Sequence, residues 1–293
     1  MPNNIKRSVK ELKGLNKTLQ KCKNSKELTG SSFWQYTDYC GVKGILNSGG
    51  IWASRLTDTN DNDEIAFHKD QVDKIYVACF CNARSEQIPL WLLYSGMDRG
   101  YALGITPSLM FDTLMKKRTI KGLIDRDNDD YVDLELGKDV EIQFGYAFYK
   151  TKNDKTYKYR NRFYELNGNQ PSFERNNFFI KKYPWEYEKE FRIVIINKTD
   201  FDFEKMIICL NDDYLKKLRI KISPNNNSTE IINYHKEILG NVKKENISSS
   251  DLSISMDLMK KNRNQIIKYL KDLCKSKRDY DIEYINDIKS ILK

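Results

Sequence analysis

Histidine is almost absent from this sequence, since only His68 and His235 occur among its 293 residues. Neither lies in a recognisable motif that would pair it with a serine or cysteine nucleophile. Catalysis that depends on histidine as general acid or base is therefore not expected. Chemistry carried by carboxylates stays open.

Long apolar runs are also missing. No stretch approaches the length of a membrane span, and no apolar segment follows the basic start as it would in a signal peptide. The composition is 40% hydrophobic and 12% aromatic, and a chain of this length can bury roughly three quarters of its unfolded surface. We expect a soluble, cytoplasmic protein with no membrane partner.

Two kinds of binding motif are absent as well. The sequence contains neither the GxxxxGK nor the GxGxxG pattern of glycine-rich phosphate-binding loops. Cys79 and Cys81 flank Phe80, but no second cysteine pair stands at the spacing of a zinc site. We therefore expect reduced, buried cysteines and no metal. The six cysteines are Cys22, Cys40, Cys79, Cys81, Cys209 and Cys274.

Positive charge is concentrated at the two ends of the chain. Residues 1–30 hold eight Lys and Arg against two acids, and residues 259–293 hold ten against five, so of the total charge of +9 the stretch 31–258 carries −2. A basic composition often indicates a nucleic-acid partner. Lysine-rich ends with little arginine are equally typical of solvated helix faces.

Hydrophobic periodicity predicts three regions. Residues 1–30 read as a basic amphipathic helix, 31–240 as one α+β domain, and 241–293 as a basic helical extension. Short strands separated by varied helical insertions favour a mostly antiparallel sheet over regular βαβ units. The acidic stretch 121–139 is interpreted as an insertion. The predicted fold is thus an α+β sheet core with amphipathic lysine-rich helices at both ends.

Residues 185–196, WEYEKEFRIVII, place charged side chains at alternate positions. If the segment is a strand, Glu186, Glu188, Glu190 and Arg192 project from one face. The segment is then either an edge strand that carries solvated charge or the floor of a functional site.

Three other clusters of polar and aromatic residues precede it. Trp34, Gln35, Tyr36 and Thr37 fall on the first strand, and Trp91, Tyr94 and Arg99 lie in PLWLLYSGMDRG. Each cluster also has an ordinary interpretation as core aromatics or turn caps. The third cluster, in the loop NDNDE, lacks the glycine and distal glutamate of a calcium loop; its candidate residues are Asn60, Asp61 and Glu64.

Taken in order, the four clusters resemble the bacterial DUF2971 family, a domain of unknown function. The resemblance covers about 33–223 and rests on FWQYT, on GVKGILNSGGIWAS followed by NDNDE, on CFCN with LWLLYSGMDRGYALGI, and on WEYEKEFR. The middle and late motifs are the most specific. Gln35 departs from the family pattern, which often has a basic residue at that position.

The order of the same parts also resembles that of ADP-ribosyltransferases, at the level of fold. This resemblance implies NAD as substrate and identifies Glu188-Lys189-Glu190 as the ExE motif. It implies that Glu190 binds a ribose hydroxyl and stabilises the ribosyl cation, while Glu188 positions the acceptor. Stacking on nicotinamide would fall to Tyr36 or Tyr94. The remaining cofactor-binding candidates are Gln35, Thr37, Trp91, Arg99 and Arg192, with Trp34 as a further candidate.

Three functions remain open from the sequence. The first is an NAD-consuming, ADP-ribosyltransferase-like enzyme, acting as a toxin or defence effector. The second is a non-catalytic module that binds nucleic acid through the lysine-rich ends or binds another protein. The third is a metal-dependent nuclease in which Asp61, Glu64 and the late carboxylates surround Mg²⁺. The oligomeric state is not indicated.

Overall fold

The computed structural model describes the central part of the chain. Its first strand begins at Phe33 and its last ends at Ser249. The predicted helix at 1–30 lies outside the described residues, as do residues 241–245 and 254–293 of the predicted helical extension at 241–293. The described ranges are 32–59, 72–82, 86–96, 99–106, 112, 114, 119–125, 130–150, 163–165, 177–210, 215, 217–225 and 246–253.

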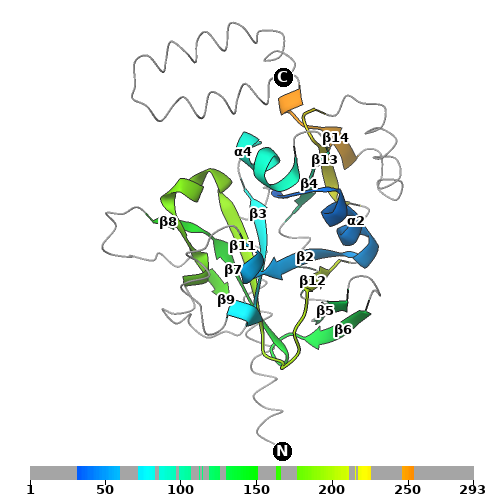
Figure 1. The fold of residues 1–293 in the computed structure, drawn as a ribbon, viewed down its shortest axis with the longest axis vertical. Helices are drawn as coiled ribbons and strands as arrows, with labels where there is room; N and C mark the ends of the chain where they lie inside the picture. Colours follow the sequence, from blue (N-terminus) through cyan, green and yellow to red (C-terminus); the bar gives the residue numbers. More distant parts are fainter. Residues whose placement is uncertain are drawn as a thin grey trace, which may run out of the picture.

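Most of the described strands belong to one twelve-stranded sheet (Figure 1). Its pairs are antiparallel except β13–β14, so the predicted mostly antiparallel sheet is confirmed. A short parallel pair, β8 and β10, lies apart from it. The strands are β1 (Phe33–Thr37), β2 (Gly50–Arg55), β3 (Ile75–Cys81), β4 (Tyr101–Ile105), β5 (Thr119–Asp125), β6 (Asp130–Glu135), β7 (Val140–Tyr146), β8 (Phe148–Lys150), β9 (Phe163–Glu165), β10 (Ile180–Lys182), β11 (Glu190–Asn197), β12 (Lys205–Cys209), β13 (Arg219–Ile222) and β14 (Ile247–Ser249).

Helices are few and short in the described part of the chain. The longest is α2, which begins after the N-cap Asp38, whose side chain accepts from Gly41 N, and ends at Gly49 in the left-handed region. None of these helices is long and apolar enough to cross a membrane. The helices are α2 (Tyr39–Ser48), α4 (Ile88–Leu90), the π-helix η3 (Trp91–Ser95) and the 3₁₀ helices η1 (Leu56–Asp58), η2 (Val72–Lys74), η4 (Asn177–Phe179) and η5 (Tyr183–Glu188).

Strand β3, at the centre of Figure 1, has three neighbours. It pairs with β11 along its whole length on one side. On the other side its end pairs with β1, where Cys81 lies opposite Trp34, and its beginning pairs with β2, where Val77 lies opposite Ser54. The two strands β1 and β2 therefore share one edge of β3 and diverge near its middle. We call this point the fork.

The alternation of side chains gives the sheet two different faces at the fork. One face is packed apolar core, in which Phe33, Phe80 and Phe191 gather from three neighbouring strands. The residues one position further along each strand, Trp34, Cys81 and Arg192, share the opposite face. The core thus fixes the strands, and the strands present polar and aromatic side chains on the other side.

The segment 185–196 is not one strand, and the prediction that four charged residues alternate on it is wrong. Pro184 lies in the first turn of η5, which proline favours because its backbone angle suits a helix start. The helix ends at Lys189, whose φ of 44° lies in the left-handed region. Only Glu190 and Arg192 alternate on β11, while Glu188 reaches the same region from η5 and Glu186 lies on the surface.

The stretch 121–139 is not an insertion beside the domain, as the sequence predicted. It forms most of the hairpin β5–β6, where Ile120 lies opposite Leu134 and both are buried in the main core. The acidic side chains of β6 hide this pattern, because they occupy its exposed positions. The sheet also continues past residue 240, the predicted end of the domain, through β14 and its pairing with β13.

Gly104 on β4 allows a close approach of the Trp34 ring. A Cβ at this position would lie 2.7 Å from ring atom Cζ3 of Trp34. We expect Gly104→Ala to lower the free energy of unfolding by about 1–3 kcal/mol, because the added methyl group overpacks the site. Urea denaturation measures this; an unchanged free energy would contradict the close contact.

Candidate functional site

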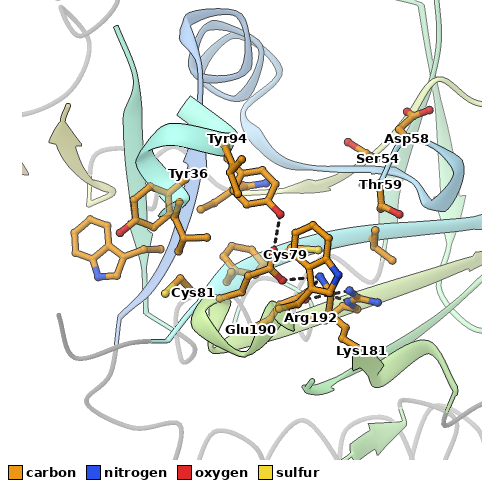
Figure 2. Close-up of a pocket in the computed structure, with 18 of the residues that line it drawn as sticks. Tyr36, Ser54, Asp58, Thr59, Cys79, Cys81, Tyr94, Lys181, Glu190 and Arg192 are labelled. Atoms are coloured by element: carbon orange, nitrogen blue, oxygen red, sulfur yellow. Dashed lines mark hydrogen bonds and ion pairs between the residues drawn. The ribbon is translucent and has the colours of Figure 1, made fainter. Parts of the chain in front are cut away.

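A cavity of about 330 Å³ opens at the fork. Its wall combines residues from β1, β2 and β3 with residues from β11, η3 and η5, so it is built by segments from both halves of the described chain (Figure 2). Ser54, Asp58 and Thr59 lie on one side of this cavity and Tyr36 on the other. The volume is near the lower end of the range for small-molecule pockets.

An arginine–carboxylate pair lies at the base of the cavity. Arg192 donates from Nε to Glu190 Oε1 (2.7 Å) and from its terminal nitrogen to Oε2 (3.0 Å). Its other nitrogen donates to the carbonyl of Phe178 (2.7 Å). The side chains of Arg192 and Glu190 are only 1% and 3% exposed. Charges at this depth persist only when paired and hydrogen-bonded, and this two-point contact supplies both.

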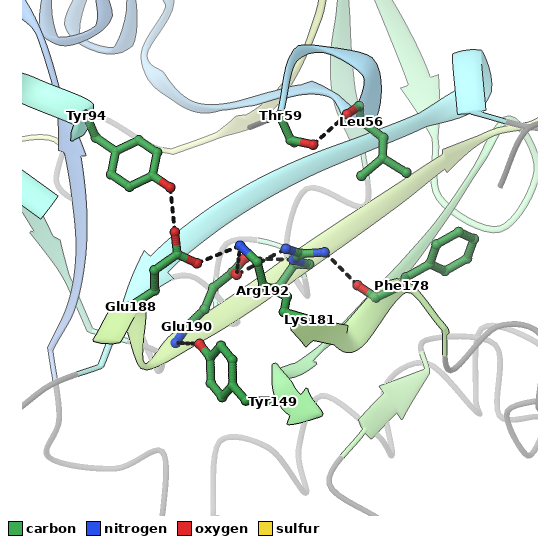
Figure 3. Close-up of polar contacts among 9 residues, drawn as sticks. All are labelled: Leu56, Thr59, Tyr94, Tyr149, Phe178, Lys181, Glu188, Glu190 and Arg192. Atoms are coloured by element: carbon green, nitrogen blue, oxygen red, sulfur yellow. Dashed lines mark hydrogen bonds and ion pairs between the residues drawn. The ribbon is translucent and has the colours of Figure 1, made fainter. Parts of the chain in front are cut away.

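Lys181 joins this pair to a second carboxylate. Its ammonium group lies 2.6 Å from Glu188 Oε2 and 3.1 Å from Glu190 Oε2. The other oxygen of Glu188 accepts from the hydroxyl of Tyr94. Figure 3 shows these contacts as one continuous network. The two cations and two carboxylates cancel in charge, which makes their burial tolerable.

The two carboxylates are in different electrostatic states. Burial raises the pKa of Glu188, and Lys181 only partly opposes this. Burial acts on Glu190 in the same direction, but Arg192 and Lys181 outweigh it and hold the pKa of Glu190 well below its usual range. The surroundings thus favour the anionic form of Glu190, whereas burial favours the protonated form of Glu188.

Neighbouring hydroxyl and thiol groups are kept protonated. Burial raises the pKa of the Tyr94 hydroxyl, and the nearby charge of Glu188 raises it further. Burial and the nearby charge of Glu190 likewise raise the pKa of the Tyr149 hydroxyl. The pKa of the Cys79 thiol is also raised by burial. Tyr94 therefore donates to Glu188, and Cys79 is a poor nucleophile despite lining the cavity.

Aromatic rings form much of the wall. Trp34, Tyr36, Trp52, Tyr94 and Trp185 all line the cavity. Tyr36 stands edge-on against the buried Trp91, with ring centroids 4.9 Å apart, which supports it from behind. Flat, polarisable walls of this kind suit a ligand that carries an aromatic ring.

Gln35 spans the fork between β1 and β2. Its Nε2 donates over 3.4 Å to the carbonyl of Trp52, while its Oε1 is buried and has no hydrogen-bond partner. An unsatisfied buried acceptor is costly, and in a cavity wall it is a candidate for contact with a ligand after a small rotation.

Seven residues predicted from three separate clusters line this one cavity. Three other predicted residues do not. Trp91 lies behind Tyr36, Thr37 packs beside the first turn of α2, and Arg99 is exposed and does not line the cavity. The candidates Asn60, Asp61 and Glu64 lie outside the described residues. The seven lining residues are Trp34, Gln35, Tyr36, Tyr94, Glu188, Glu190 and Arg192.

Sequence reasoning missed Lys181, which contacts both carboxylates. No local sequence signal marks it: only the structure shows that Lys181 is buried on β10 while its neighbour Lys182 is exposed. The sequence predicts Trp185 only as the first residue of the motif WEYEKEFR, and the structure places it on the cavity wall. Asp58 and Thr59, which also line the cavity, directly precede the loop NDNDE, and no sequence motif singles them out.

Comparison with known proteins gives no further assignment. No protein-family model matches the chain, and no curated protein is similar to it at a significant level. The resemblances to the DUF2971 family and to ADP-ribosyltransferases therefore stay predictions.

We expect Lys181→Met to lower the free energy of unfolding by about 3–5 kcal/mol, because it leaves buried carboxylate charge without its partner. Chemical denaturation of the two proteins measures the difference. Lys138→Met is the matched control: Lys138 is 74% exposed and its contact with Asp139 is 4.0 Å long, so almost no change is expected. Equal effects of the two substitutions would contradict the network.

Proposed function

We propose that the chain is a cytoplasmic enzyme that binds NAD and cleaves its nicotinamide–ribose bond, in the manner of an ADP-ribosyltransferase. The observation that carries the proposal is the position of Glu188. It is 5% exposed, lies on the wall of an aromatic cavity, and is held by Tyr94 and Lys181. A toxin or defence effector would use such a site to modify a target or to consume NAD.

The chemistry of this bond requires a carboxylate. As the bond to nicotinamide breaks, positive charge develops on the ribose, as it does in glycoside hydrolysis. A fixed carboxylate next to the ribose stabilises that charge most where water is excluded. Glu188 satisfies both conditions, because Tyr94 and Lys181 fix its two oxygens and each oxygen retains a lone pair.

The proposal exchanges the roles that the sequence suggested for the two carboxylates. Both oxygens of Glu190 are bound by Arg192, and one also by Lys181. A ribose hydroxyl that bound Glu190 would compete with this buried two-point contact, whereas each oxygen of Glu188 accepts a single hydrogen bond. Glu190 therefore serves as the fixed anion that holds Lys181 and Arg192, and Glu188 is the carboxylate that faces the ribose.

The cavity fits the nicotinamide and ribose portion better than a whole dinucleotide. Its aromatic wall suits the nicotinamide ring, and its volume of about 330 Å³ suits a group of this size. Both cations of its wall, Lys181 and Arg192, are already bound to carboxylates, and the exposed Arg99 lies elsewhere. We infer that the phosphates and adenosine extend out of the cavity.

The two other functions rest on residues outside the described part of the chain. A nucleic-acid or protein-binding module would depend on the lysine-rich ends. A Mg²⁺ nuclease would depend on Asp61 and Glu64, and its late carboxylates would have to leave Lys181 and Arg192. Among the described residues no group of three or more His, Cys, Asp or Glu is arranged to hold a metal ion.

The direct test is release of nicotinamide from NAD by the purified full-length protein. We expect Glu188→Gln to reduce release by at least about 10²-fold, because the substitution removes the charge that faces the ribose. Glu186→Gln is the matched control, since Glu186 lies on the same helix but its side chain is 41% exposed. No release by the wild type with a panel of protein and nucleic-acid acceptors, or undiminished release by Glu188→Gln, would overturn the proposal.

The same assay followed against pH tests the ionisation of Glu188. The reaction needs the carboxylate, and burial raises its pKa, so activity should fall on the acid side at a pH above the ordinary glutamate value of about 4.3. Tyr94→Phe keeps the ring but removes a donor to the ionised form, and should move this limb to still higher pH. A limb at or below the ordinary value would contradict the assignment.

A further inference from the structure

A second carboxylate hub lies behind the aromatic wall of the cavity, around Glu86. Its Oε1 accepts from Lys221 Nζ (2.6 Å) and from the backbone of Asp251 (2.8 Å). Its Oε2 accepts from Trp91 Nε1 (2.9 Å) and from the hydroxyl of Ser250. Four donors thus converge on one carboxylate whose side chain is only 6% exposed.

The hub fastens residues 246–253 to the sheet. Ser250 donates its backbone N–H to Ile222 (2.9 Å), and its hydroxyl also accepts from Leu252 N (3.1 Å), so both groups of Ser250 are used. Asp251 adds an ion pair of 2.6 Å to Lys221. We refer to residues 246–253 as the C-terminal segment.

The hub reaches the two aromatic residues of β1 that line the cavity, Trp34 directly and Tyr36 through Trp91. The ammonium group of Lys221 lies 5.1 Å from the ring centre of Trp34, within the range of a cation–π contact. Trp91, held by Glu86, supports Tyr36 edge-on. Leu252 of the C-terminal segment packs in the same apolar cluster as Trp34, Tyr36 and Trp91.

The charge on Lys221 is maintained in this setting. Burial lowers the pKa of Lys221, but its hydrogen bonds to Asp251 and Glu86 outweigh this and raise it above its ordinary value. The ammonium group therefore stays positive, as a cation–π contact with Trp34 requires.

We propose that Glu86 and Lys221 are positioning residues of the cavity: by tying the C-terminal segment to Trp34 and Trp91, they hold the wall formed by Trp34 and Tyr36 in the orientation that receives an aromatic ligand. Neither residue lines the cavity, so both act through the rings. Ligand binding and docking of the C-terminal segment are then thermodynamically coupled, and each strengthens the other. The proposal rests on the proposed function only in taking this cavity as the binding site.

The test uses full-length protein labelled with 5-fluorotryptophan, whose four tryptophans give separate ¹⁹F resonances that single Trp→Phe variants assign. Lys221→Met should shift or broaden the resonance of Trp34, and Glu86→Gln those of Trp34 and Trp91. Lys221→Arg keeps the cation and should restore the wild-type position of Trp34. Lys74→Met is the matched control, because Lys74 is a partly buried lysine that bonds to the carbonyl of Thr199 away from this wall.

The affinity for NAD, measured by fluorescence titration, is the second readout. We expect Lys221→Met to weaken it about tenfold and Lys221→Arg to recover it, because the wall residues are coupled to the ligand through their orientation. An unmoved Trp34 resonance in Lys221→Met, in a protein that remains folded, would overturn the proposal. Absence of NAD binding by the wild type would count against the proposed function alone, and the ¹⁹F spectra would still decide the positioning role.

Discussion

Neutralisation of two buried carboxylates by two buried cations is the interaction on which this site depends. Glu190 and Arg192 form its fixed part, because a two-point contact at this depth cannot be broken without leaving an unpaired charge. Lys181 extends the network to Glu188, and Tyr94 completes it. The result is a carboxylate that is held in place, shielded from water and still able to accept a contact from a ligand.

The forked sheet makes this arrangement accessible. If β1 and β2 did not diverge along β3, backbone pairing and packed side chains would fill the space above Cys79 and Cys81. Apolar side chains on the opposite face hold the strands, so the polar face is free to carry charge. The turn at Lys189 is equally necessary. It reverses the chain between η5 and β11 and so brings Glu188 next to Lys181, whereas in a continuous strand Glu188 would lie two residues further along from Glu190.

Much of this architecture follows from sequence patterns, and the rest depends on long-range contacts. The β-branched and aromatic residues of IYVACFC predict β3, and the apolar run FRIVII predicts the strand that follows Glu190. The aromatic and charged clusters predict seven of the residues that line the cavity. In WEYEKE the alternation of charged residues predicts a strand, and this prediction is wrong. Pro184 favours the start of the 3₁₀ helix η5, and the left-handed Lys189 ends it. Lys181 could not be found, because nothing local distinguishes an inward-facing lysine from its exposed neighbour until its two carboxylate partners are in place. The hairpin β5–β6 was missed because its acids occupy the exposed positions and mask a buried stripe.

A crystal structure of the protein with NAD bound tests the central claim most directly, that Glu188 and not Glu190 faces the ligand. The account predicts a nicotinamide ring against the aromatic wall at Tyr36 or Tyr94, the ribose beside Glu188, and the contact between Glu190 and Arg192 unbroken. Ribose bound to a Glu190 that has left Arg192, or NAD bound away from the fork, would contradict it.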